Sequence, residues 1–282
     1  MPGKNYLDSI VNFWRVYSGE NDIAVNKCED FLSKIINVKE FPLTRLSSTT
    51  ASETAKVLEN SYRATNIAFM DEWGNFSEKI GVDMFEILQA IRIRPTHSNI
   101  RQPGFGVGGY CLTKDPLFAP LSAKYLFKLD SKFPLSTQAL KINREMPLHT
   151  FEIIREKFVI LEGKKILLAG ISYLQNVADT RFSPSEILYK KLISYGAEVI
   201  CYDPLIRYWE ELDVKVIDHL SKCPNVDCIV FTVQHDEFKE INFKDWLDGL
   251  KPFVIDTNCC FSKKILGEIS ALGCENYAIG RG

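Results

Sequence analysis

Four short apolar runs in the C-terminal part of the chain constrain its fold more than any other feature. Segments of helical character separate these runs, which lie at residues 165–170, 197–202, 227–233 and 253–256. A strand that is buried on both faces of a sheet reads as a continuous apolar run, and parallel strands need crossover connections between them. The sequence therefore predicts an α/β fold, in which residues 159–282 form a Rossmann-like domain with a doubly wound parallel sheet.

The first of these runs is followed by a loop and then by a well-marked helix start. Ser183 stands at the cap position and Pro184 in the first turn, while Gly196 closes the helix. A capped helix just beyond the carboxyl end of a strand is either an anion site or simply a well-formed connection, and both interpretations stay open here. Three nearby cations are expected to add to an anion site: Lys164, Lys165 and Arg181.

Residues 50–158 are predicted to be mostly helical. Thr50 and Glu53 form a capping box, which predicts that a long helix begins there, and Gly81 predicts its end. Mostly apolar side chains recur along this helix at alternating spacings of three and four residues: Leu58, Tyr62, Thr65, Phe69, Trp73, Phe76 and Ile80. Such a stripe must be buried, either against the rest of the chain or at a symmetric dimer seam along helix 50–80.

The remaining N-terminal segments are less distinctive. A second helix is predicted over residues 136–158, with a bend near Pro147. Residues 1–49 read as a β-α-β fragment, too small to stand alone as a domain, with its elements at residues 15–19, 21–36 and 38–46. The chain is therefore predicted to consist of three parts: residues 1–49, 50–158 and 159–282.

Composition excludes several classes of function. The 282 residues carry a net charge of −2, which provides no basic field for nucleic acid or for a membrane surface. No apolar stretch is long enough to span a bilayer, and the N-terminus lacks the profile of a signal peptide, so we expect a cytoplasmic protein. Eight cysteines without a CxxC pair and four scattered histidines predict neither a disulfide framework nor a metal site.

The stretch at residues 104–116 holds the clearest chemical signal. Four glycines lie within six consecutive positions: Gly104, Gly106, Gly108 and Gly109. Such a backbone can curl tightly and approach a ligand closely. Cys111 follows at once, with Lys114 and Asp115 just beyond it, which is the pattern of a nucleophile with charged partners. The alternative is a glycine-rich loop that carries a buried and inert cysteine.

The same stretch also matches the pattern G-x-G-x-x-G, through Gly104, Gly106 and Gly109. In dinucleotide-binding proteins this pattern follows a buried strand and opens a helix. Here it follows residues 100–103, whose arginine and proline do not suit a central strand. We therefore interpret the match as coincidental, and not as an NAD fingerprint.

Three stretches, taken in order, resemble the UDP-glucose/GDP-mannose dehydrogenase family. They are residues 51–69, residues 104–116, and residues 170–184 with their run Asp-Thr-Arg-Phe-Ser-Pro; the terminal residues 278–282 are similar as well. The resemblance covers nearly the whole chain and is closest in character to bacterial members that serve surface polysaccharides. Enzymes of this family oxidise the C6 alcohol of a nucleotide sugar to a carboxylate with two NAD+.

The resemblance implies a role for each of four catalytic residues. Cys111 would be the nucleophile that adds to the intermediate aldehyde and then carries a thioester, and Asp115 would activate the water that cleaves it. Lys56 and Asn60, four residues apart on one helix face, would hold and polarise the oxygen at C6.

The resemblance also implies how the substrate is held. Main-chain amides of Gly104, Gly106, Gly108 and Gly109 would reach the sugar, and Tyr173 and Arg181 would contact the substrate. Arg181 is in addition a possible cofactor contact. The C-terminal α/β domain would bind the UDP part of a UDP-sugar, and the helical region would form a homodimer.

Two departures from the family pattern stand out. Leu174 follows Tyr173 where the family has a lysine that contacts substrate, so a positive charge is lost beside an anionic ligand. No strand–G-x-G-x-x-G–helix unit precedes residue 50, and Met1–Lys4 resemble a segment that lies late within the family's NAD-binding domain. Residues 1–49 are therefore expected to be a remnant of that domain.

Three hypotheses about function follow from these features. The first is a truncated or split UDP-sugar dehydrogenase, whose NAD domain comes from a possible separate chain. The second is a catalytically inactive protein that binds UDP-sugars or acts as a dimerising scaffold. The third, with little support, is a cysteine hydrolase that pairs Cys111 with His97.

Overall fold

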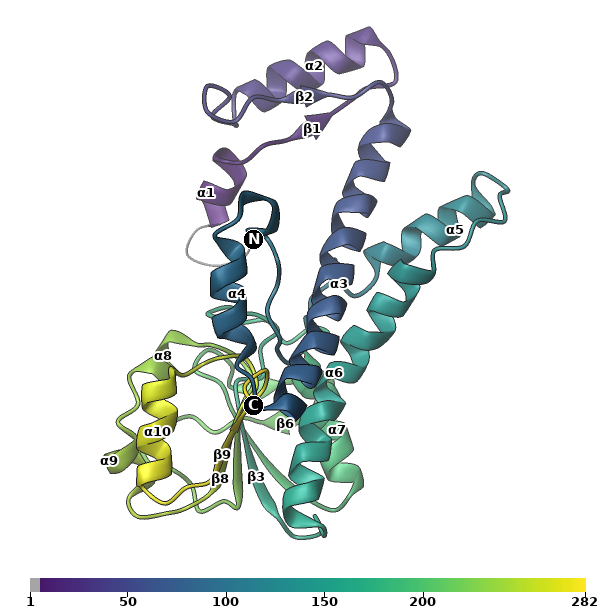
Figure 1. Cartoon of the computed structure of the whole chain (residues 1–282). Coiled ribbons are helices and arrows are strands. Elements are labelled where there is room, and N and C mark those ends of the chain that lie inside the picture. The colour runs from purple at the N-terminus through teal and green to yellow at the C-terminus, as the bar shows by residue number, and fades with distance from the viewer. Residues whose placement is uncertain (1–5) are drawn as a thin grey trace. The chain divides into compact units, whose positions relative to one another are not determined.

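The computed structural model of the chain describes residues 6–282, which divide into two compact units (Figure 1). The first unit comprises the described residues up to Tyr62 together with Asp115–Phe133. The second comprises Arg63–Lys114 together with Pro134–Gly282. The expected resemblance of Met1–Lys4 to an internal segment falls outside the described residues.

The first unit contains a two-stranded parallel sheet and short helices. Its elements are α1 (Tyr6–Val11), β1 (Val16–Tyr17), α2 (Asp22–Ser33), β2 (Thr44–Arg45), the first part of α3 (Thr49–Ile80), the 3-10 helix η2 (Asp115–Leu117) and α5 (Phe118–Tyr125). Val16 lies opposite Thr44 in the register of β1 and β2. The predicted β-α-β order is confirmed, but each strand has only two residues, because the two strands find no further partner among the described residues.

The start of α3 differs from the predicted capping box. The helix begins at Thr49, and the hydroxyl of Ser48 accepts a hydrogen bond from the backbone N–H of Ala51 at 3.1 Å. Ser48 is therefore the residue that caps α3, and the assignment of this role to Thr50 with Glu53 is wrong. Serine and threonine are both common N-caps, so the run Ser-Ser-Thr-Thr left the choice ambiguous in sequence.

The second unit is built on a five-stranded parallel sheet. Its strands are β3 (Lys165–Ala169), β4 (Glu198–Tyr202), β7 (Cys228–Phe231), β8 (Phe253–Asp256) and β9 (Asn276–Ala278), arranged in the order β4-β3-β7-β8-β9. Its other elements are the rest of α3, α4 (Met84–Arg92), η1 (Pro95–His97), α6 (Pro134–Phe158), α7 (Pro184–Ser194), β5 (Tyr208–Trp209), η3 (Glu210–Leu212), β6 (Val214–Lys215), α8 (Asp236–Lys239), α9 (Phe243–Leu247) and α10 (Lys263–Ala271). The doubly wound fold and its four predicted strands are confirmed, and β9 is an addition.

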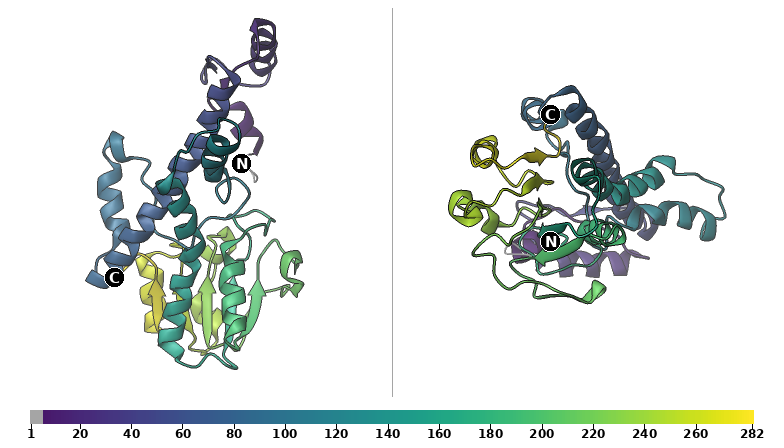
Figure 2. Two further views of the ribbon diagram at one scale, coloured as in Figure 1. Left: turned by 90° about the vertical axis from the view of Figure 1, so that its right-hand side faces the viewer. Right: turned by 90° about the horizontal axis from the view of Figure 1, so that it is seen from below.

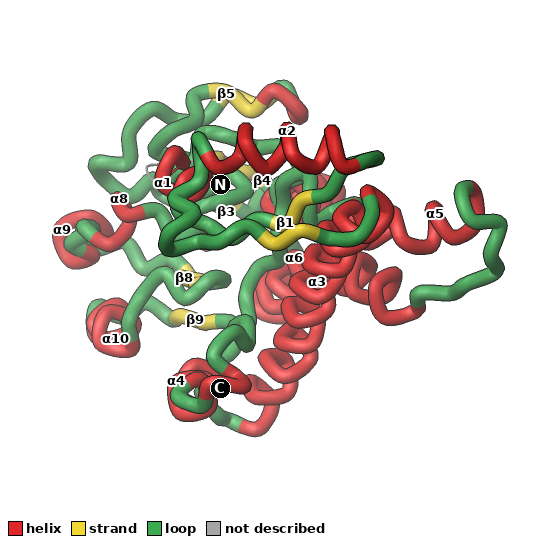
Figure 3. Tube along the Cα trace, turned by 90° about the horizontal axis from the view of Figure 1, so that it is seen from above, coloured by secondary structure: helices red, strands yellow, loops and turns green. Residues whose placement is uncertain are grey.

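Helices cover both faces of this sheet, because alternate residues of each strand point to opposite faces. Ile166 and Leu168 of β3 belong to one apolar core, which includes side chains of α6 and α7. Leu167 and Ala169 belong to a second core with side chains of α8, α9 and α10. Figures 2 and 3 show α6 on one side of the sheet and α9 and α10 on the other.

The local signals around α7 hold in the structure. The hydroxyl of Ser183 accepts a hydrogen bond from the N–H of Ser185, and Pro184 is the first helical residue. Gly196 follows the helix with a φ of +81°, a conformation that favours glycine. α6 runs unbroken through Pro147 to Phe158.

The mostly apolar stripe of α3 is not part of the core within the chain. Its large apolar members are 46 to 66% exposed: Leu58, Tyr62, Phe69, Trp73, Phe76 and Ile80. Within the second unit, α3 packs through a different face, on which Ala64 and Ala68 contact Ala139 of α6, and Met70 contacts Met84 and Leu88 of α4. Of the two interpretations of the stripe, burial against the chain itself is therefore wrong.

Within residues 6–282, no helix combines the length and the apolar character that crossing a bilayer requires.

Candidate active site

The glycine stretch lies in a loop of the second unit, where two asparagine side chains hold its backbone. Asn143 of α6 pairs with both backbone groups of Val107: its Oδ1 accepts the N–H at 2.8 Å, and its Nδ2 donates to the carbonyl at 2.8 Å. Asn258, just after β8, accepts the N–H of Phe105 at 3.2 Å. The phenyl ring of Phe105 is 1% exposed, so the loop is anchored by a buried side chain as well.

Two of the glycines are required by close contacts with the loop after β3. A Cβ atom on Gly108 would lie 2.3 Å from the carbonyl oxygen of Phe182, a distance that no side chain tolerates. Gly109 has a φ of +78°, and a Cβ there would lie 2.9 Å from the ring of Tyr173. The backbone N–H of Gly109 donates to the carbonyl of Arg181 at 3.1 Å. The glycine stretch and residues 173–182 therefore form one packed layer.

Cys111 emerges from this layer into solvent. It is the exposed one of the eight cysteines, all of which lie within residues 6–282, so the interpretation as a buried inert thiol is wrong. The preceding Tyr110 packs edge-on against Phe182, with ring centroids 5.1 Å apart, and the guanidinium of Arg181 lies 4.8 Å from the Tyr110 ring. An exposed thiol on a fixed backbone is what a cysteine nucleophile needs.

Arg181 is already engaged by a carboxylate. Its guanidinium donates two hydrogen bonds to Asp179, and this ion pair holds the pKa of the Asp179 carboxyl below its ordinary value. Arg181 therefore lies beside the glycine stretch, but Asp179 partly neutralises its charge.

A cavity of about 220 Å³ opens between the glycine stretch and the carboxyl ends of β3, β7 and β8. The glycine stretch contributes Gly106 and Val107 to its walls, and the start of α7 contributes Ser185. Tyr173 and Leu174 line it from the loop after β3. Ligands of open α/β sheets bind in this position, at the carboxyl ends of the strands.

Two of the expected cations do not take part. Lys164 and Lys165 lie at the opposite, amino end of β3, where Lys164 pairs with Asp227 at 2.8 Å and Lys165 with Glu198 at 3.9 Å. Their assignment to an anion site near α7 is therefore wrong. A strand of five residues separates its two ends by roughly 15 Å, and sequence proximity to β3 did not reveal which end the lysines occupy.

In the first unit, the structure brings Asn60 and Asp115 together. The Nδ2 of Asn60 donates to Asp115 Oδ2 at 2.6 Å, and both side chains are buried. This contact fixes the amide orientation, because the reverse would set an oxygen against the carboxylate. The Oδ1 of Asn60 then faces no hydrogen-bond partner among the described residues, although it is fully buried.

Lys56 precedes Asn60 by one helical turn and is exposed. It lines a cleft of about 990 Å³ in the first unit, together with Trp14 and Phe118. An ammonium group and an unpaired amide oxygen one turn apart suit the binding of a polar group or a water molecule.

The described residues contain neither a strand–G-x-G-x-x-G–helix unit nor a metal-ligating group of side chains. The G-x-G-x-x-G match at 104–109 lies in a loop without a preceding strand, so its rejection as a fingerprint is confirmed. Within residues 6–282, no group of three or more His, Cys, Asp or Glu side chains is arranged to hold a metal ion. His97 lies in η1 and bonds the hydroxyl of Thr96, and in this part of the chain no hydrogen bond joins Cys111 to a histidine.

Sequence reasoning missed Asn143 and Asn258. Both act on backbone groups that are distant in sequence, 36 and 153 residues away, and no local pattern reports such a contact. The one available signal was that Asn258 comes just after a predicted strand, where an amide side chain can satisfy loop backbone; Asn143 lies inside a predicted helix and carried no such signal.

Comparison with known proteins agrees with the resemblance read from the residues. The family model for the central domain of the UDP-glucose/GDP-mannose dehydrogenase family matches residues 50–145. The model for the UDP binding domain of the same family matches residues 167–263.

Individual relatives are archaeal sugar dehydrogenases. UDP-N-acetyl-D-mannosamine dehydrogenase of Methanocaldococcus jannaschii is 31% identical over 246 residues, which cover 87% of this chain and 53% of the relative. The enzyme of the same name from Methanococcus maripaludis is 33% identical over 257 residues, 89% of this chain and 56% of the relative. The solved UDP-D-ManNAc dehydrogenase of Pyrococcus horikoshii has a TM-score of 0.83 at 27% identity, over 100% of this chain and 63% of its own. The chain spans about half the length of the curated relatives it matches.

Proposed function

Because the chain belongs to the UDP-glucose/GDP-mannose dehydrogenase family, we propose that it binds a UDP-sugar and acts in the oxidation of its C6 alcohol to the uronic acid. The observation that carries this proposal is the packed layer in which the glycine stretch presents an exposed Cys111 beside a cavity at the carboxyl ends of the sheet. The product would serve the synthesis of a surface polysaccharide. We expect this role to be exercised in the cytoplasm, where nucleotide sugars are made.

The second unit supplies the proposed nucleotide-sugar site. Backbone N–H groups of Gly104, Gly106 and Gly108 reach the sugar and phosphates, whereas that of Gly109 donates to Arg181 and holds the stretch in place. Tyr173 forms part of the cavity wall. Arg181 supplies positive charge from the edge of the layer, and its ion pair with Asp179 partly neutralises that charge. Relatives named for UDP-N-acetyl-D-mannosamine make that sugar the first substrate to test.

Each proposed catalytic residue then has one task. The Cys111 sulfur adds to the aldehyde carbon, and the carbonyl oxygen takes up a proton to give a thiohemiacetal. After oxidation to the thioester, water attacks the carbonyl carbon, one of its protons passes to Asp115, and the carbon–sulfur bond breaks to release the thiolate and the carboxylic acid, which then loses its proton to solvent. Lys56 and Asn60 stabilise the negative charge that develops on the C6 oxygen. The hydrogen bond from Asn60 to Asp115 supports assigning these two residues to one site.

The oxidant of the family reaction is NAD+, which accepts the hydrides when it is bound. Residues 6–282 contain no strand–G-x-G-x-x-G–helix unit, and the NAD+ site would then lie on other polypeptide, such as a separate NAD-domain chain. Residues 1–49, 50–158 and 159–282 would then be a remnant of the NAD-binding domain, the dimerising region with the catalytic cysteine, and the UDP-sugar-binding domain.

We also propose that the chain forms a homodimer through α3. In the second unit, Phe69, Trp73 and Phe76 remain about half exposed, and they line an apolar groove of about 350 Å³ between α3 and α4. An exposed apolar groove of this kind is typical of a protein–protein contact. A Trp73→Glu variant should be monomeric by light scattering, whereas Ile193→Glu, an equally exposed site on α7, should leave the dimer intact. A wild-type monomer at micromolar concentration would refute this assignment.

Calorimetric titration with UDP-N-acetyl-D-mannosamine and with NAD+ tests the proposed function. We expect heat from the UDP-sugar, little change in that heat for Cys111→Ser, and no heat from NAD+. Absence of UDP-sugar binding would refute the proposal, and NAD+ binding would refute our account of the cofactor.

The inactive-scaffold alternative is favoured by one observation, the apolar Leu174 in the cavity wall. It is distinguished by complementation with a family NAD domain. If the wild-type chain forms the uronic acid and Cys111→Ser does not, the scaffold hypothesis is excluded. If no acid forms although the added NAD domain is competent, the scaffold hypothesis is favoured.

A further inference from the structure

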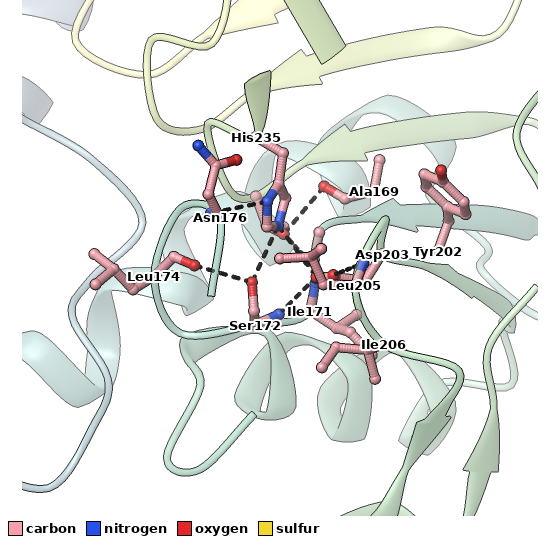
Figure 4. A network of polar contacts seen from close by, with 12 residues as sticks. Ala169, Ile171, Ser172, Leu174, Asn176, Tyr202, Asp203, Leu205, Ile206 and His235 are labelled. Carbon is pink, nitrogen blue, oxygen red and sulfur yellow. Dashed lines mark hydrogen bonds and ion pairs between the residues drawn. The ribbon is translucent and has the colours of Figure 1, made fainter. Parts of the chain in front are cut away.

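Three loops at the carboxyl ends of β3, β4 and β7 meet in a buried polar cluster (Figure 4). Its centre is His235, which follows β7 and is 1% exposed. Ser172, after β3, and Asp203, after β4, are fully buried beside it. Burying three polar side chains is costly unless each has partners, so the contacts of this cluster indicate what it holds.

The hydrogen bonds of the His235 ring define its tautomer. Its Nδ1 accepts the backbone N–H of Asn176 at 3.1 Å, so in the neutral ring the proton resides on Nε2. Nε2 lies 3.0 Å from the Ser172 hydroxyl and 3.2 Å from Asp203 Oδ2. The ring therefore links Ser172 to Asn176, two points of the loop after β3 that are four residues apart.

The three residue types are those of a hydrolytic triad, but the arrangement excludes that chemistry. In a triad the serine and the aspartate bind different ring nitrogens, whereas here both face Nε2. The hydroxyl of Ser172 is also inaccessible and donates to the carbonyl of Leu174 at 3.2 Å. The cluster therefore has a structural role, which is to hold the backbone of the loops that carry it.

Asp203 holds the beginning of the loop directly. Its Oδ2 accepts the N–H groups of Ile171 at 2.9 Å and Ser172 at 3.0 Å, and its Oδ1 accepts that of Leu205 at 2.9 Å. Burial alone would raise the pKa of Asp203, but the hydrogen bonds from His235 and from the backbone outweigh it and lower the pKa. An ionised carboxylate is thus the form that the loop requires.

The segment fixed in this way, residues 171–176, is the one that faces the candidate site. Its Tyr173 packs on Gly108 and Gly109, two to three residues before Cys111, and its Leu174 lines the cavity. Asp203 holds Ile171 and Ser172 by hydrogen bonds, and His235 holds Asn176. The backbone between these residues therefore has little freedom to move away from the glycine stretch.

From these contacts we infer that His235 is a positioning residue for nucleotide-sugar binding, acting through residues 171–176 without touching the ligand. The inference rests on the proposed function, since it concerns the same cavity. It adds a residue that is remote from the glycine stretch in sequence and that carries none of the assigned catalytic or binding roles.

The test compares three variants of the full chain with UDP as the probe. His235→Leu removes every polar contact of the ring, and we expect UDP to bind about tenfold more weakly, since two hydrogen bonds that order the loop are lost. His235→Gln keeps a polar group near the Nε2 position and should recover most of the affinity. Asp227→Asn, at the opposite end of the sheet, serves as the control for stability, and it should leave UDP affinity unchanged.

Hydrogen exchange separates failure of this inference from failure of the proposed function. In His235→Leu, amides of residues 171–176 should exchange at least about tenfold faster, while those of β8 stay protected, whether or not UDP binds. If wild type fails to bind UDP, the proposed function falls, and faster exchange would still support the positioning role. Unchanged exchange together with unchanged UDP affinity would overturn the inference.

A second variant covers the case in which His235→Leu does not fold. Ser172→Ala removes one hydroxyl and should weaken UDP binding about threefold with a smaller rise in exchange. Loss of affinity in Asp227→Asn equal to that in the cluster variants would mean that stability alone explains the effect, and it would likewise overturn the inference.

Discussion

The two edges of the five-stranded sheet use charged side chains in opposite ways. At the amino edge, Lys164 pairs with Asp227 and Lys165 with Glu198 in partly exposed ion pairs. At the carboxyl edge, Asp203 and Asp256 are fully buried, and each accepts three backbone N–H groups. Those bound by Asp203 come from the loops after β3 and β4, and those bound by Asp256 come from the loop after β8. The amino edge therefore carries solvent-exposed ion pairs, and the carboxyl edge uses buried carboxyl groups to hold the backbone of its loops in place.

This difference explains why the candidate site lies where it does. An exposed ion pair gains little free energy, so the amino edge tolerates change. A buried carboxylate that satisfies several N–H groups lets a loop keep a conformation that regular structure does not supply. The loops after β3 and β8 are held in this manner, and they in turn contact the glycine stretch.

The largest expected effect contrasts the two edges directly. Asp203→Asn places an amide N–H group against buried N–H donors and should lower the free energy of unfolding by about 2–4 kcal/mol. Asp227→Asn, whose side chain is one-third exposed, should cost about 1 kcal/mol or less. Urea denaturation at pH 7 measures both, and equal costs would break the comparison.

The pH dependence of the same pair sharpens the contrast. The folded-state pKa of Asp203 is lowered, because hydrogen bonds to the carboxylate outweigh burial. Its stabilisation is therefore fully present above the unfolded-state pKa and is lost as pH falls through the lower folded-state value. The gap in stability between wild type and Asp203→Asn should stay constant from pH 8 to about 5 and shrink below about pH 4.

The next effect concerns the layer that the carboxyl edge supports. Gly108→Ala would force Cβ against the carbonyl of Phe182, so we expect UDP to bind at least about tenfold more weakly. Gly267→Ala is the matched control, since nothing lies within 4 Å of its Cβ and it stands inside α10. That change should stabilise the fold by about 0.5–1 kcal/mol without altering affinity. Normal UDP affinity in Gly108→Ala would contradict the packed layer as the binding site.

The smallest expected effect is a gain in affinity for the UDP-sugar. Leu174→Lys restores a positive charge to the cavity wall and should tighten UDP-sugar binding about threefold to tenfold at low salt, less at high salt. Ile193→Lys adds the same charge at the far end of α7 and should change affinity little. Titration calorimetry at two ionic strengths compares them, and an equal response from both would mean that the charge acts only at long range.

The sequence predicted the parts of this molecule that depend on local pattern. The strands β3, β4, β7 and β8 were found because strands buried on both faces are continuously apolar. The strand β9 has three residues, of which Asn276 and Tyr277 are only partly buried, so it carried no such signal. Exposed Cys111 was identified as a candidate from its neighbours alone.

Contacts between distant loops were beyond the reach of pattern. Asn60 meets Asp115 across 55 residues, and the family resemblance, rather than spacing, pointed to that pair. The cluster of Ser172, Asp203 and His235 joins three loops, each unremarkable in sequence. Its existence depends on strand order, which places β3 between β4 and β7.

Hydrogen exchange of the wild-type chain with and without UDP-N-acetyl-D-mannosamine tests the central claim most directly. The account predicts slower exchange in residues 104–109, 171–176 and 232–236, and no change at the amino edge around residues 163–165 and 227. Protection at the amino edge, or none in the glycine stretch at saturating ligand, would contradict a nucleotide-sugar site at the carboxyl edge of the sheet.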